Sequence, residues 1–151
     1  MWDRERTRQQ SELEIEQLRL LIETHRSLLT KCATTAPDAI ERSALATLLH
    51  SFYTGIENIL KRTTLAADGG LPKGASWHRD LLESMTKPSS ARKAVLSVAL
   101  RERLQPYLEF RHVFRQAYSF QLQWEKMAAL VLGCEEAFAS LQKDLDAFFR
   151  A

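Results

Sequence analysis

The sequence predicts an all-α protein folded as an up-and-down helical bundle. Leu, Ala, Glu, Arg and Gln dominate the 151 residues, and apolar residues recur at three- and four-residue spacing instead of alternating with polar ones. Only 5 Gly and 4 Pro interrupt the chain, which leaves room for long helices. The length fits a single domain over residues 1–151. We therefore expect four long helices and one short helix.

The first half of the chain contains two of the expected long helices and the short one. An apolar stripe predicts a first helix over residues 3–32, and a second stripe predicts a helix over residues 37–68. Gly69 and Gly70 follow the second stripe, as is typical where a helix ends. Ser76 is a suitable N-cap for a short helix over residues 77–85, because its hydroxyl can accept an early backbone N–H.

The second half contains the other two long helices. A helix is expected from about Ser97, and Pro106 leaves two alternatives, a true start near Gln105 or a kink at the proline. We expect this helix to continue through the segment 111–118. Ser119 and Phe120 mark an interruption, and a last helix is predicted over residues 123–149.

Charge and composition exclude several classes of function. The net charge is +2, from 21 basic and 19 acidic residues, so any contact with nucleic acid must come from a local cluster. Cys32 and Cys134 lack metal-ligand spacing and are expected to be reduced core residues, with a long-range disulfide as the alternative. The N-terminus is charged and no apolar run approaches roughly 18 residues. We expect a cytoplasmic protein without a membrane span, metal or cofactor.

The segment from Arg111 to Tyr118 carries the most chemistry. On a continuous helix Arg111, Arg115 and Tyr118 would share one face. Two guanidiniums a turn apart can bind a phosphate, and a tyrosine ring can stack on a base. The alternative is that the arginines pair with acids such as Glu109 or Glu57 on a solvated face, while Tyr118 packs in the core.

This segment resembles the signature of the HEPN superfamily, and most closely that of its HepT-like ribonuclease toxins. The signature reads arginine, four to six residues, histidine, any residue, tyrosine. Arg111 and Tyr118 stand at the matching positions, and Gln116 stands where the pattern has histidine. Other segments resemble the same family in order and spacing, namely residues 52–62, 71–82 and 107–120.

The resemblance implies a homodimer whose two signatures meet in a shared cleft. Arg111 would then hold the scissile RNA phosphate, and the residue at position 116 would perform general acid–base chemistry on the ribose 2′-hydroxyl, without a metal. Glutamine cannot exchange a proton at any useful pH, which should cost on the order of 10²–10⁴ in rate. The chain is therefore expected to be a toxin with weak or lost ribonuclease activity, or alternatively a non-catalytic HEPN module that binds nucleotide or RNA.

Two further residues are candidates for supporting roles. His112 could replace the missing base from the other subunit, although it lies ~100° around a helix from Arg111; the alternative is a histidine that only bonds a neighbour. The resemblance implies that Glu57 orients Arg111; the alternative is a surface glutamate paired with Lys61. His25, His50 and His78 show no ligand spacing and receive no site role.

The resemblance also implies a protein partner. HepT-like toxins are typically encoded beside a small nucleotidyltransferase antitoxin, which transfers AMP onto the signature tyrosine. Tyr118 is the matching position, and the added phosphate would lie against Arg111 and Arg115. The alternative function is that of a partner subunit of the nucleotidyltransferase without catalysis of its own.

Overall fold

The computed structural model describes residues 1–118 and 121–151, and within them all regular secondary structure is helical. The predicted all-α class is confirmed. The helices are α1 (Arg4–Thr24), α2 (Arg26–Cys32), α3 (Ala39–Asp68), α4 (Trp77–Ser84), α5 (Val98–Phe114), α6 (Trp124–Leu132) and α7 (Cys134–Arg150).

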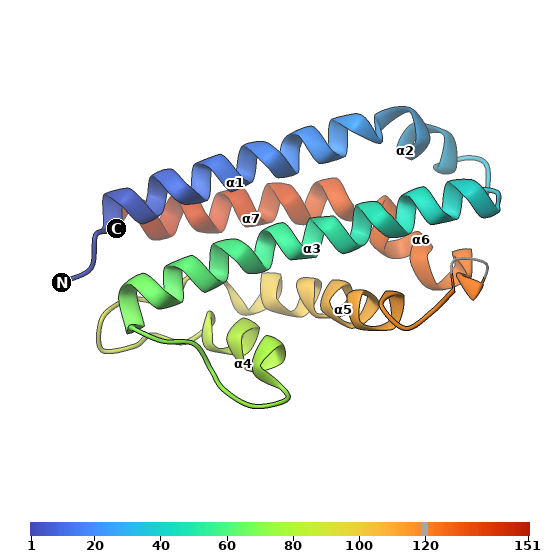
Figure 1. The fold of residues 1–151 in the computed structure, drawn as a ribbon. Helices are drawn as coiled ribbons and strands as arrows, with labels where there is room; N and C mark the ends of the chain where they lie inside the picture. Colours follow the sequence, from blue (N-terminus) through green and yellow to red (C-terminus); the bar gives the residue numbers. More distant parts are fainter. Residues whose placement is uncertain (119–120) are drawn as a thin grey trace.

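The long helices α1, α3, α5 and α7 run side by side in alternating directions, which makes an up-and-down bundle (Figure 1). Both chain ends lie at the same end of the bundle. There the Trp2 ring stacks on Phe148 with centroids 6.2 Å apart, and the Arg4 guanidinium donates to the Phe148 carbonyl. The short helix α4 lies beside α3 and α5, at the side of the bundle away from α1.

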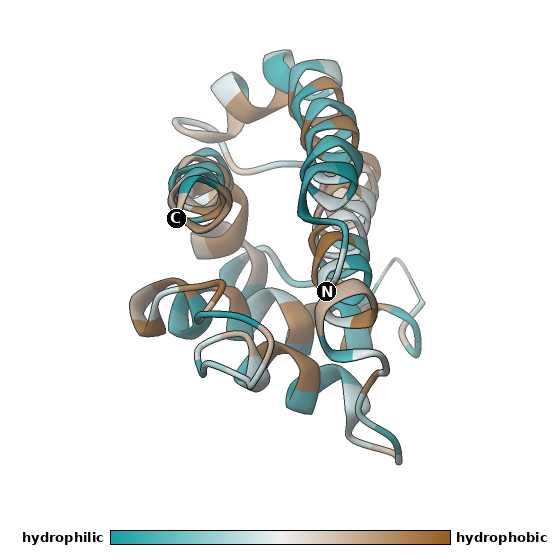
Figure 2. Cartoon of the chain, turned by 90° about the vertical axis from the view of Figure 1, so that its left-hand side faces the viewer, coloured by the Kyte–Doolittle hydropathy of each residue, from teal (hydrophilic) through white to brown (hydrophobic). Residues whose placement is uncertain are grey.

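Helix α3 is the central element, because it contacts α1, α4, α5 and α6. Its fully buried side chains include Phe52, Tyr53 and Ile56. The helices carry hydrophilic and hydrophobic residues together, as Figure 2 shows in a view along the bundle. Gly55 lets α1 come close to α3, since a Cβ at this position would lie 2.5 Å from Leu18 Cδ2.

Two of the expected long helices are each divided, so their predicted continuity is wrong. At His25 the ring Nδ1 lies 2.9 Å from the Leu21 carbonyl, while the backbone N–H bonds to Ile22, one residue nearer than in an α-helix. This exchange separates α1 from α2. At Gly133 the backbone turns with ψ near 0°, which separates α6 from α7.

The predicted ends of α3 agree with the structure, and the predicted cap of α4 does not. Asp38 and Glu41 form a reciprocal capping box at the start of α3, and Gly69 ends the helix with φ of 80°. Ser76 occupies the N-cap position of α4, but its hydroxyl makes no capping bond. It lies instead 3.2 Å from Asp80 Oδ2, because a carboxylate within the first turn competes for the hydroxyl.

Helix α5 begins at Val98 and continues through Pro106, so a start near Gln105 is wrong. The Ser97 hydroxyl caps it by accepting from the Leu100 backbone N–H at 3.1 Å. The helix ends at Phe114, so the expectation that it continues to Tyr118 is also wrong. The expected interruption at Ser119 and Phe120 lies outside the described residues.

Both cysteines are free and buried, so the long-range disulfide is not present. Burial raises the pKa of the Cys134 thiol to about 12, and it raises that of Cys32 as well. The thiols therefore remain protonated at neutral pH. Within residues 1–118 and 121–151, no helix combines the length and the apolar character that a membrane crossing requires.

The close approach at Gly55 gives a test of the α1–α3 contact. Gly55→Leu should lower the free energy of unfolding by about 1–3 kcal/mol, because the new side chain must displace Leu18 within a filled core. Denaturant titration measures the change. Ala66→Leu, at an exposed position of the same helix, is the matched control and should change stability little. Equal stability of both variants would show that α1 moves away from α3 at no cost.

Candidate functional site

The site is built around Arg111, in the last turn of α5, whose side chain is only 4% exposed. Its Nη2 lies 3.0 Å from Glu57 Oε2, and its Nη1 lies 3.5 Å from Thr54 Oγ1. The guanidinium also covers the Tyr53 ring, 5.0 Å from its centroid. All three partners come from α3, so the ion pair joins the two helices at one point. The contacts hold the arginine in one orientation.

His78 on α4 completes a three-residue cluster. Its Nδ1 lies 2.7 Å from Glu57 Oε2 and 3.0 Å from Arg111 Nη2. The Trp77 ring covers it, with centroids 3.7 Å apart, and the His78 side chain remains 30% exposed. A carboxylate, a guanidinium and an imidazole from three different helices thus meet within hydrogen-bond distance.

A row of polar residues on α3 explains how the cluster forms. His50, Thr54, Glu57 and Lys61 recur at helical spacing, and a buried apolar residue directly precedes each of them. Thr54 and Glu57 contact Arg111, and the Lys61 ammonium lies 5.8 Å from the centre of the Trp77 ring. Polar positions at this spacing beside a buried apolar face are the signal that predicts a buried polar site.

His50 lies beside the same cluster at the next turn of α3. Its ring is 5.5 Å from that of Phe114. Burial lowers the pKa of His50, and the positive charges of Arg111 and Arg115 lower it further. The lowered pKa favours the neutral form of the His50 ring at physiological pH.

A pocket of about 470 Å³ opens between α4 and α5 on the side of His78 and Arg111. Arg79, His112 and Arg115 also line the pocket and add basic groups to it. Glu109 is the acid among the lining residues. An anion that entered the pocket would meet a predominantly basic lining. A guanidinium has more N–H donors than Glu57 and Thr54 use, so Arg111 can still bind a phosphate oxygen.

The sequence-predicted residues fall into two groups. The first group lines the pocket and comprises Arg111, His112 and Arg115. Glu57 belongs with it, because it is buried and pairs with Arg111, so the alternative of a surface pair with Lys61 is wrong. Gln116 and Tyr118 lie in the turn after α5 and are not among the residues that line it. Their positions in the site stay predictions.

The turn after α5 also corrects the expected geometry of the segment. The backbone N–H groups of Gln116 and Ala117 bond to carbonyls three residues earlier, at 3.0 and 3.4 Å, which tightens the chain. Arg111, Arg115 and Tyr118 therefore do not share one helix face. Tyr118 is 71% exposed, so the alternative in which it packs in the core is also wrong.

His78 is the site residue that sequence reasoning missed. It lies in a short helix after a loop, and helical spacing carries no information across such a connection. The sequence offers one cue, because Trp77 and His78 follow the helix that carries Glu57 between apolar positions. This order is compatible with a contact between His78 and Glu57 but does not specify it.

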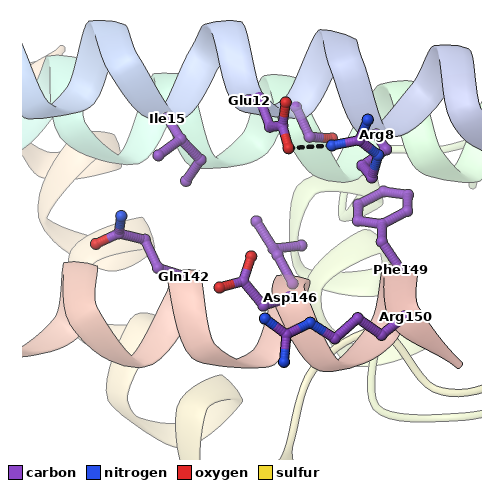
Figure 3. A pocket seen from close by; sticks show the side chains of 9 residues that line it. Arg8, Glu12, Ile15, Gln142, Asp146, Phe149 and Arg150 are labelled. Atoms are coloured by element: carbon purple, nitrogen blue, oxygen red, sulfur yellow. Dashed lines mark hydrogen bonds and ion pairs between the residues drawn. The ribbon is translucent and has the colours of Figure 1, made fainter.

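A second pocket lies between α1 and α7, far from the signature in the sequence (Figure 3). Arg8, Glu12, Asp146 and Arg150 line it together with apolar side chains such as Phe149. One of its two arginines is already engaged, since Arg8 bonds to Glu12 (Figure 3) and to Glu5. Two acids line this pocket beside the two arginines, whereas the lining of the pocket at Arg111 is predominantly basic, and we therefore assign the candidate site to the Arg111 cluster.

The described residues include no group of three or more His, Cys, Asp or Glu side chains arranged to hold a metal ion. The protein is thus an all-helical bundle with a buried arginine, Arg111, in the last turn of α5. The chain belongs to the family of HepT-like proteins, whose sequence model matches residues 44–151. This match includes every residue of the cluster and confirms the resemblance to HepT-like HEPN proteins. No curated protein and no solved structure gave a significant match.

The buried ion pair gives a direct test of the cluster. Glu57→Ala should lower the free energy of unfolding by about 3–5 kcal/mol, because it leaves Arg111 buried without a counter-charge. Denaturant titration measures the loss, and Glu109→Ala, at an exposed position on α5, is the matched control. Adding Arg111→Met to Glu57→Ala should cost less than the sum of the two single changes. Additive losses would show that the two side chains do not depend on each other.

Proposed function

We propose that this chain is the toxin subunit of a toxin–antitoxin pair, with an RNA endonuclease site centred on Arg111. The observation that carries the proposal is the guanidinium fixed by Glu57 at the edge of a basic pocket, in a chain of the HepT-like family. A prearranged guanidinium binds a phosphate without further ordering, which is what phosphate-ester cleavage requires. The protein acts in the cytoplasm, where RNA is available.

The pocket chemistry supports RNA as the substrate. Arg79 and Arg115 are exposed and line the pocket beside the buried Arg111, so backbone phosphates on either side of the scissile one have cationic partners. Apolar and aliphatic surface from Leu108 and Val113 also lines it. The exposed Val113 and Tyr118 offer contact area for a second copy of the chain, which we propose completes the cleft in a homodimer.

Gln116 sets the expected rate. It occupies the signature position where a histidine would exchange protons with the ribose 2′-hydroxyl, and an amide can only hydrogen-bond there. We infer that cleavage by this chain is slow. The same observation favours one other function, a non-catalytic module that binds RNA or nucleotide, or that serves as the partner subunit of a nucleotidyltransferase.

The experiment that tests the proposed function is restoration of the signature histidine. Gln116→His should increase the rate of cleavage of a synthetic single-stranded RNA by on the order of 10²–10⁴, because it returns a group that titrates near neutral pH. Denaturing gels measure the rate. Gln116→Asn is the matched control and should leave the rate unchanged. Absence of cleavage in both the natural chain and Gln116→His would favour the non-catalytic module.

We also propose Tyr118 as the acceptor of AMP from a nucleotidyltransferase antitoxin. Its exposed phenol is accessible to a second protein, whereas Tyr53 and Tyr107 are buried. Burial raises the pKa of both buried phenols, which makes them poorer nucleophiles. In the transfer the Tyr118 oxygen attacks the α-phosphorus of ATP, pyrophosphate leaves, and the phenolic proton passes to a base of the partner enzyme.

Modification by the partner can be assigned to one residue. Incubation with ATP and the nucleotidyltransferase encoded beside this chain should add one AMP to the natural chain and none to Tyr118→Phe, by intact-mass measurement. Arg115→Ala retains the phenol and serves as the control for a change in the same turn. An adduct on Tyr53 or Tyr107 would contradict the assignment and leave the ribonuclease proposal unaffected.

A further inference from the structure

We propose that His78 is the catalytic base of this chain and transfers the proton that Gln116 cannot. The inference rests on the proposed ribonuclease function and deepens it. It follows from the pairing of the His78 imidazole with Glu57 beside Arg111, in a pocket with room for a nucleotide.

The pair with Glu57 fixes the protonation of the His78 ring. A separation of 2.7 Å between Nδ1 and Oε2 requires a proton between them, because an imidazole lone pair and a carboxylate oxygen would repel each other. Glu57 is the acceptor, since Arg111 already donates to the same oxygen from 3.0 Å. The neutral His78 ring therefore carries its proton on Nδ1, and its Nε2 is left with a free lone pair. This carboxylate–imidazole arrangement orients and stabilises a general base.

The position of the ring suits the reaction. Arg111 Nη2 lies 3.0 Å from His78 Nδ1, so a phosphate held by the guanidinium is next to the imidazole. His78 and Arg111 line the same pocket, and among the described residues no hydrogen bond to His78 Nε2 is present. The Trp77 ring lies against the His78 ring, with an angle of 30° between their planes, and limits its rotation. A nucleotide phosphate and its 2′-hydroxyl are thus brought to the two groups that the reaction needs.

The proposed step balances with these residues alone. His78 Nε2 takes the proton of the 2′-hydroxyl while the 2′-oxygen attacks the phosphorus held by Arg111. The bond from phosphorus to the 2′-oxygen forms, and the bond to the 5′-oxygen of the next nucleotide breaks. The His78 imidazolium, stabilised by Glu57, then returns the proton to the leaving 5′-oxygen. The products are a 2′,3′-cyclic phosphate and a 5′-hydroxyl.

The other histidines near the cluster are less suited to this role. His112 lines the pocket, but no described side chain bonds its ring, so nothing fixes its orientation or tautomer. His50 has its Nδ1 buried without a partner, and burial together with Arg111 and Arg115 lowers its pKa. It also lines a different groove, between α1 and α3. His78 alone combines a carboxylate partner with a place beside Arg111.

The charges around His78 come from three helices. Glu57 lies against Nδ1 and Arg111 lies next to it, so a negative and a positive charge act on the ring at short range. The other charged or titratable groups that face it across the pocket or over Trp77 are Lys61 of α3, Arg79 of α4, and Glu109, His112 and Arg115 of α5. Each of these groups can shift the pH dependence of cleavage, so the pH profile should be measured for variants that change one group at a time.

The test measures cleavage of a synthetic single-stranded RNA, and binding of the same RNA with 2′-O-methyl groups that prevent cleavage. His78→Gln should lower the slow cleavage by the natural chain by on the order of 10² or more, while binding of the methylated RNA is retained. His25→Gln, at the junction of α1 and α2 and outside the pocket, is the control and should cleave as the natural chain does.

The double variant Gln116→His with His78→Gln separates a base from a structural residue. If His78 is the base, the restored histidine replaces it and the double variant cleaves. If the double variant is inactive while Gln116→His is active, His78 only supports the fold and the inference is overturned.

Two further outcomes separate the inference from the proposed function. Unchanged cleavage by His78→Gln, or no cleavage by the natural chain when Gln116→His cleaves, would overturn the role of His78 and leave the ribonuclease proposal in place. No cleavage by any variant would overturn both.

Discussion

The buried pair between Arg111 and Glu57 is the interaction on which the rest of the site depends. Two charges removed from water are tolerated only when they compensate each other, so the last turn of α5 must meet α3 at Glu57. His78 bonds to the same carboxylate and thereby ties α4 to the pair. The Tyr53 and Trp77 rings cover the cluster and reduce its access to water, which strengthens the electrostatic interactions within it. Stability and the geometry of the site therefore have the same origin.

This dependence explains why α3 carries polar residues in the middle of a core. Helix α3 contacts four other helices, and an entirely apolar α3 would pack against all of them with little to select one register. Glu57 and Thr54 both accept from Arg111 and thereby fix where its guanidinium lies against α3. The pair thus helps to select the relative position of α3 and α5, and it also fixes the guanidinium for which we propose phosphate binding. Arg92 plays a comparable part at the far end of α3, where its buried guanidinium pairs with Asp68 at 3.0 Å and ties down the loop before α5.

Periodicity predicted the helices well and their interruptions poorly, for a physical reason. The apolar stripes reflect which face is buried, and a stripe continues across His25 and Gly133 because both neighbouring helices pack on the same core. The breaks are local, a bond of the His25 ring to the Leu21 carbonyl in one case and a backbone turn at Gly133 in the other, and they leave no periodic signal. The end of α5 at Phe114 was missed in the same way. Proximity of Glu57 to Arg111 was predictable because the resemblance to HepT-like proteins relates the two helices, whereas contact with His78 depends on the path of the loop from residue 69 to 76.

Gln116 lies apart from the residues that hold Arg111 in place. The groups that fix Arg111 lie on α3 and α4, whereas position 116 lies beyond the end of α5, in an exposed turn. A substitution there changes neither the buried pair nor the core, so the loss of histidine from the signature carries little cost in folding. In the proposed ribonuclease, phosphate binding and proton transfer are therefore assigned to different parts of the fold. Arg111 would hold the phosphate in a chain with glutamine at position 116, and we infer that the proton-transfer group comes from a residue that contacts the Arg111–Glu57 pair. Among the described residues other than Arg111, His78 is the one that bonds to Glu57 and also lines the pocket.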